Sequence, residues 1–164
     1  MPRATKKVCP TCGQAVTEYG QKITPGLADA LVRFKEAVLY YGRNDIDPSN
    51  DMGKGSPFEL SFAQRANITI LRKHGLLAKV KNPDGSRKMG HWLLTKRGNQ
   101  FVTGELAIPE RVYTLMNQVV RHSDNLVTIK DVWGKEPRFE DSNTMERRAV
   151  APSAVAQPSL LNDN

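Results

Sequence analysis

The chain has 164 residues, of which 39% are hydrophobic, and it carries a formal net charge of +7 with an isoelectric point near 9.6. This length suits one globular domain with tails, and the positive charge favours a polyanionic partner, either a nucleic acid or an anionic membrane. No stretch approaches the roughly 20 apolar residues that span a bilayer, and no apolar N-terminal stretch is typical of a secretion signal, so we expect a cytoplasmic protein without a membrane partner.

The N-terminal segment, residues 1–22, is polar and contains the only two cysteines, Cys9 and Cys12, within the sequence CPTCG. Their spacing is too short for an ordinary disulfide framework and suits a reducing compartment. A Cys-x-x-Cys knuckle supplies half of a tetrahedral zinc site, so we predict that this pair binds zinc. Inert thiols and redox chemistry are the alternatives. His74, His91 and His122 do not stand at zinc-finger spacing, so two chains could each donate a cysteine pair.

A first helix is predicted after this segment. Thr24 is a good N-cap, Pro25 suits the first helical position, and Gly42 is a natural stop. Between them, apolar residues recur on one stripe at helical spacing. Residues 43–57 are rich in Asn, Asp, Gly, Ser and Pro, which predicts a long, mobile loop.

A second helix is predicted over residues 61–74, with Ser61 as its cap and Gly75 as its end. The helical period places four residues on the buried side: Phe62, Ala63, Ala66 and Ile70. The opposite face then carries Gln64, Arg65, Ile68 and Arg72. Glutamine can pair with adenine, arginine can pair with guanine, and an aliphatic group can meet a thymine methyl. This face is therefore a candidate for reading DNA bases, and an ordinary solvent-exposed face is the alternative.

After Gly75 the apolar pattern changes to that of strands. Two short apolar runs flank the turn Pro83-Asp84-Gly85, which predicts a β-hairpin over residues 79–95. Thr95 then caps a short helix that ends at Gly104. Residues 106–134 predict two or three short strands, with a hairpin turning at Asn117-Gln118, and residues 135–164 predict a disordered tail.

The positive charge is concentrated in the second helix and the hairpin. Between residues 62 and 101 the chain has nine Lys or Arg and a single acidic residue, Asp84. A solvated surface normally mixes both signs, so this segregation favours contact with phosphate. A solvated hairpin that merely keeps the protein soluble is the alternative. If about five of these cations contact phosphate, the logarithm of affinity should fall with the logarithm of salt concentration at a slope of about −4.5.

The stretch ILRKHGLLAKVKNPDGSRKMGHWLLTKRGNQFV, residues 70–102, resembles the winged-helix variant of the helix-turn-helix superfamily. The Gly-Leu-Leu step at Gly75 and the stretch from Trp92 to Phe101 carry this resemblance, which covers residues 24–105. It implies an α+β protein with a winged-helix domain over 23–105, a β-strand extension over 106–134 and the tail. In that family the second helix of the motif enters the major groove and the hairpin, or wing, lies along the backbone.

The same resemblance implies a DNA-binding regulator of transcription. CPTCGQ, the predicted wing and GELAIPERVY are also similar to small uncharacterised proteins frequent in bacteriophage genomes. No phosphate-binding loop or nucleophile elbow occurs in the sequence, so we do not predict an enzyme. The candidate DNA-contacting residues are Gln64, Arg65, Ile68, Arg72, Lys73, Lys79, Lys81, Arg87, Lys88, Lys96 and Arg97.

One departure from the winged-helix pattern leaves a second function open. The family normally has a compact helix before the recognition helix, but residues 44–62 are a poor helix former. A degenerate winged helix often binds protein. The alternative is therefore an adaptor or inhibitor that grips a host protein or a ribonucleoprotein. A homodimer is open as well, although no long dimerisation helix is evident.

Overall fold

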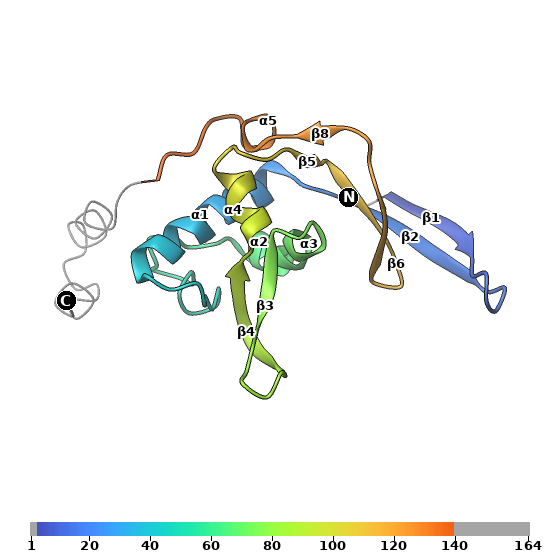
Figure 1. The fold of residues 1–164 in the computed structure, drawn as a ribbon, viewed down its shortest axis with the longest axis horizontal. Coiled ribbons are helices and arrows are strands. Elements are labelled where there is room, and N and C mark those ends of the chain that lie inside the picture. Colours follow the sequence, from blue (N-terminus) through green and yellow to red (C-terminus); the bar gives the residue numbers. More distant parts are fainter. Residues whose placement is uncertain (1–2, 140–164) are drawn as a thin grey trace.

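The computed structural model describes residues 3–139, and the predicted tail lies largely outside this range. The described chain is a mixed α+β protein, as predicted. Helices form its central part, and two β-hairpins project from this part in different directions (Figure 1). No helix within residues 3–139 is long and apolar enough to cross a membrane.

The first predicted helix is confirmed as α1 (Pro25–Tyr41). The Thr24 hydroxyl accepts a hydrogen bond from the Leu27 N–H at 3.3 Å, and Gly42 ends the helix with a left-handed backbone at φ 65°. The helix packs against the four helices α2 to α5 and supplies fully buried side chains such as Leu31 and Phe34 to the core. Burial of these apolar groups is the main stabilising contribution to the fold.

The second predicted helix is wrong in one respect, because Asn67 divides it into α2 (Phe62–Ala66) and α3 (Ile68–Lys73). Ser61 caps α2 as predicted. The break changes the phase of the helical wheel, so the predicted burial is also partly wrong. Phe62 is 81% exposed, whereas Ile68 is only 7% exposed and lies in the core. Ala63 and Ala66 are exposed rather than buried, and Ile70 packs at the edge of the core.

The predicted basic hairpin is confirmed as β3 (Leu77–Lys81) and β4 (Arg87–Leu94). It is followed by α4 (Lys96–Val102), whose first turn is capped by Thr95 as expected. Gly98 of α4 lies directly against β3: a Cβ atom there would approach the Leu76 carbonyl oxygen to 2.1 Å. Only glycine therefore allows the helix to pack this closely on the base of the hairpin.

The loop after α1 is irregular, as predicted, but it is anchored to the core. Met52 and Phe58 are buried, and Ile46 forms an antiparallel bridge with Trp92 of β4. Its residues 47–51 form one tight turn in which the Asp51 N–H donates to the Asp47 carbonyl at 2.7 Å. No helix is found between α1 and α2 in the described chain, in agreement with the poor helix-forming sequence of residues 44–62.

A four-stranded antiparallel sheet pairs the N-terminal hairpin with a second hairpin from residues 111–122. Its strands lie in the order β1 (Arg3–Val8), β2 (Ala15–Lys22), β6 (Arg111–Leu115) and β7 (Gln118–His122). The N-terminal segment is therefore a hairpin, with the cysteine knuckle at its turn. The predicted β6–β7 hairpin is confirmed, although its turn lies at Met116 and Asn117, both at positive φ.

Two short elements complete the chain. Strand β5 (Ile108–Pro109) pairs with β8 (Leu126–Val127), and α5 (Ile129–Trp133) then packs on α1. Helix α5 was not predicted from the sequence. It begins with a reciprocal capping box between Thr128 and Asp131, which is a helix-start signal that was present in the sequence.

Candidate nucleic-acid interface

The β3–β4 hairpin changes from apolar to cationic between its base and its tip. The register pairs Leu77 with Leu94 at the base, where both are buried. Lys79 pairs with Trp92 in the middle, and its ammonium group lies 3.7 Å from the centroid of the Trp92 ring. This cation–π contact holds the lysine side chain along the hairpin.

Near the tip, the register shifts between Lys79 and Lys81, and beyond this shift Lys81 pairs with Arg87. Both side chains are exposed. Because directly opposed side chains on paired strands lie close together, two like charges there repel each other and destabilise the hairpin.

Arg72 of α3 extends this cationic face onto the helical part of the protein. Burial lowers the pKa of Lys79 below its ordinary value, and the nearby positive charges of Arg72 and Arg87 lower it further. The charges of Arg72 on α3 and Arg87 on β4 therefore both lie close enough to Lys79 to act on it. We call Arg72, Lys79, Lys81 and Arg87 the basic cluster. Within residues 6–139, none of its members forms an ion pair.

Three other cations predicted to contact DNA have structural partners. The Lys88 ammonium forms a 2.8 Å ion pair with Asp45, which also contacts His91 at 2.6 Å. Both contacts lower the pKa of the Asp45 carboxyl group. Lys88 therefore ties β4 to the loop after α1. The Arg97 guanidinium donates to the His74 carbonyl at 3.1 Å and lies against Gly75 at the end of α3. Lys73 donates to the Asn117 carbonyl at 3.2 Å.

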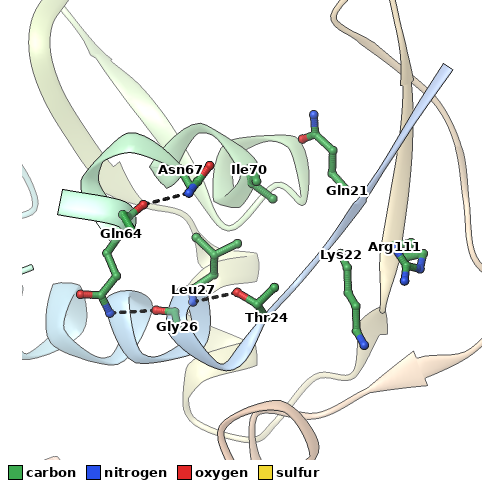
Figure 2. Close-up of a pocket in the computed structure, with 10 residues that line it drawn as sticks. Gln21, Lys22, Thr24, Gly26, Leu27, Gln64, Asn67, Ile70 and Arg111 are labelled. Carbon is green, nitrogen blue, oxygen red and sulfur yellow. Dashed lines mark hydrogen bonds between the residues drawn. The ribbon is translucent and has the colours of Figure 1, made fainter. Parts of the chain in front are cut away.

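Two of the four residues predicted to face DNA bases, Gln64 and Ile68, are not free to contact them. Ile68 is buried, so it is not presented to a base. The Gln64 amide donates to the Gly26 carbonyl at 2.9 Å (Figure 2). It also donates to Asp29 at 3.0 Å, and the Gln64 side-chain oxygen accepts the Ser61 N–H. The other two predicted residues outside the cluster are Arg65, half-buried on α2, and Lys96, exposed at the start of α4.

A pocket of about 540 Å³, not predicted from the sequence, lies between β2, β6 and the helices α1, α2 and α3. Figure 2 shows Gln21 and Arg111 on its strand side and Ile70 on its helix side. The Gln21 Oε1 and Arg111 Nη1 atoms are buried and have no hydrogen-bond partner within residues 6–139. These two residues are 90 positions apart in the chain, so no local sequence motif could have predicted that they line one pocket.

The cysteine knuckle lies at the turn between β1 and β2, far from the basic cluster along the chain. Cys9 and Cys12 are free thiols 3.5 Å apart. The Cys9 N–H donates to the Gln14 carbonyl at 2.7 Å, and the Gly13 N–H donates to the Cys9 carbonyl at 2.9 Å. Hydrogen bonds from the backbone of Cys12 and Thr11 lower the pKa of the Cys9 thiol.

None of the three histidines joins the cysteines. Among the described residues, no group of three or more His, Cys, Asp or Glu is arranged to hold a metal. The His74 ring is buried, with Nε2 at 3.0 Å from the Gln21 carbonyl, and burial lowers its pKa to about 4. His91 contacts Asp45, and His122 is exposed on β7.

Comparisons of the chain with protein-family models, with curated proteins and with solved structures found no match.

Proposed function

We propose that the protein binds nucleic acid, with duplex DNA as its partner, and that the basic cluster contacts the phosphate backbone. The surroundings of Lys79 carry this proposal, because the positive charges of Arg72 and Arg87 both act on it and none of the three forms an ion pair in the described chain. Bringing phosphate to such a cluster relieves the repulsion and releases counterions condensed on the DNA.

The order of elements gives further support. A helix, a loop, a second helical segment, a hairpin and a further helix follow each other from α1 to α4, as in the winged-helix pattern that the sequence resembles. In that arrangement the β3–β4 hairpin is the wing and α3 is the end of the helix beside the groove. We propose a phage or mobile-element regulator of this class as the biological setting.

The placement of Gln64 and Ile68 changes the expected mode of binding. Since Ile68 is buried and the Gln64 amide is already hydrogen-bonded, we propose that phosphate contacts supply most of the affinity. Phosphate contacts fix position and orientation but carry no direct sequence information. Weak discrimination between duplex sequences is the expected behaviour.

Two adjacent residues on β4 allow a matched test. Arg87→Ala removes a member of the basic cluster, whereas Lys88→Ala removes a cation that is already paired with Asp45. We expect Arg87→Ala to weaken binding of a fluorescent duplex and Lys88→Ala to leave it nearly unchanged, as measured by anisotropy at constant salt.

Two outcomes would contradict the proposal. Equal loss of affinity in both variants would mean that the cluster has no special role. Absence of duplex binding by the wild type at low salt, together with nuclease-resistant capture of one host protein from bacterial lysate, would support a protein-binding adaptor instead.

A further inference from the structure

The cysteine knuckle at the tip of the β1–β2 hairpin plays no part in the proposed contact with DNA. Its backbone is closed by the hydrogen bonds of Cys9 and Gly13, and Gly13 has a left-handed φ of 74°. The 3.5 Å between Cys9 and Cys12 is too long for a disulfide, in which the sulfur atoms are about 2.0 Å apart. It is close to the separation of about 3.8 Å between two thiolates on one tetrahedral zinc ion.

The backbone of the knuckle forms one closed turn. The Gly13 N–H donates to the Cys9 carbonyl and the Cys9 N–H donates to the Gln14 carbonyl, so both cysteines are held in the same turn. The knuckle is therefore arranged to present two sulfur ligands to a single cation, as half of a closed zinc site.

The chain cannot complete this site with its own nitrogen or sulfur ligands. It has two cysteines and three histidines, and residues 1–2 and 140–164 contain neither type. His91 lies in β4, and its Nδ1 atom is 2.6 Å from the Oδ1 atom of Asp45. His74 contacts the Gln21 carbonyl, and the register of the sheet places His122 opposite Val112, which is itself opposite Gln21.

Gln21 lies at the far end of β2 from the knuckle. It is six residues beyond Ala15, where the strand leaves the turn, so the two ends of this stretch are about 20 Å apart at roughly 3.3 Å per residue. His74 and His122 are therefore both at the wrong end of the sheet to reach the metal. A structural zinc site is closed by four nitrogen or sulfur ligands, so the remaining two must come from another molecule.

We propose that two copies of this chain share one Zn²⁺, which is bound by Cys9 and Cys12 of each copy. Four thiols lose their protons to solvent as the four zinc–sulfur bonds form, and no oxidant or reductant is needed. The position of the knuckle permits this assembly, because Thr11, Cys12 and Gly13 are exposed and the hairpin projects from the helical part (Figure 1). The exposed Val8 beside the knuckle adds apolar surface that the second copy would cover.

The test uses the full chain, purified under reducing conditions without chelator. Elemental analysis and native mass spectrometry should find one zinc per two chains in a dimer, and Cys12→Ser should lose both the metal and the dimer. His122→Asn is the matched control, because it removes a possible ligand but leaves the knuckle intact, and it should keep the wild-type stoichiometry. Circular dichroism of Cys12→Ser should match the wild type, since the knuckle lies outside the core.

Cobalt substitution gives an independent readout on the wild-type chain. The visible spectrum of Co²⁺ should be that of a tetrahedral ion with four thiolate ligands. One zinc per monomeric chain would overturn the proposal, as would a metal-free monomer with two free thiols after incubation with Zn²⁺. An intramolecular disulfide between Cys9 and Cys12 without bound metal would also overturn it. None of these results depends on DNA binding, so this inference and the proposed function can fail separately.

Discussion

Replacing Arg87 with Glu converts the pair that it forms with Lys81 across the hairpin from two like charges into a cation and an anion. The change leaves the buried base of the hairpin at Leu77 and Leu94 untouched. If the basic cluster exists to meet phosphate, the variant should become more stable while it loses its affinity for DNA.

The expected gain in stability follows from cross-strand pairing. Opposite charges on directly opposed residues contribute roughly 0.2–1 kcal/mol, and like charges there are destabilising. Because Lys81 and Arg87 are exposed, we expect Arg87→Glu to raise the free energy of unfolding by about 0.5 kcal/mol at low salt. Urea unfolding at two salt concentrations measures the gain, which should shrink at high salt as the charges are screened.

The expected loss of binding has the opposite sign. The variant removes one phosphate contact and places a negative charge beside the backbone of the DNA. Neutral Arg87→Ala removes the contact alone, so the salt dependence of its affinity should become shallower by about 0.9 in slope. Arg87→Glu should bind more weakly than Arg87→Ala at every salt concentration.

The reasoning would be refuted in either of two ways. Tight DNA binding by Arg87→Glu would show that the tip of the hairpin does not face phosphate. A clear loss of stability in Arg87→Glu would show that Lys81 and Arg87 do not repel each other, and the basic cluster as described would not exist.

Two further predictions concern the fold. The pKa of His74 is about 4 in the folded protein and about 6.5 in the unfolded chain. As the pH falls, the unfolded chain therefore binds a proton at His74 before the folded protein does. The free energy of unfolding should therefore decrease by about 3 kcal/mol between pH 6.5 and pH 4. His74→Gln should flatten this part of the pH profile of urea unfolding, and an unchanged profile would contradict the buried neutral ring. Gly98→Ala should destabilise the protein by about 1–3 kcal/mol in thermal unfolding, because the alanine Cβ would overlap the Leu76 carbonyl. This loss should outweigh the higher helix propensity of alanine. A more stable variant would show that α4 does not lie this close to Leu76, the residue before β3.

Local signals predicted the elements whose ends are set by their own residues. Thr24 and Gly42 bound α1, Thr95 caps α4, and the turn at Pro83-Asp84-Gly85 closes the basic hairpin. Each of these signals acts within a few residues, through a capping hydrogen bond or a backbone conformation that glycine favours.

Contacts between distant segments account for what the sequence did not predict. The break at Asn67 turns Ile68 toward the core, which depends on how α1 and α3 pack rather than on the helical period of residues 61–74. Strand β2 pairs with β6, almost a hundred residues later, so the N-terminal sheet has no local signature beyond the knuckle.

The same limit applies to the candidate site. Charge segregation drew attention to the hairpin, but it could not separate Arg87 from Lys88. The difference between them is the carboxylate of Asp45, which comes from a loop 43 residues earlier. Likewise, Arg97 binds the His74 carbonyl only because α4 packs beside the end of α3.

The most direct test of the central claim is the salt dependence of duplex DNA binding by the wild-type protein. Four phosphate contacts from Arg72, Lys79, Lys81 and Arg87 predict that the logarithm of the affinity falls with the logarithm of the salt concentration at a slope of about −3.6. This is shallower than the slope of about −4.5 for five contacts that the sequence suggested, because Lys88 is occupied by Asp45. A slope near zero, or no measurable affinity at low salt, would contradict the account.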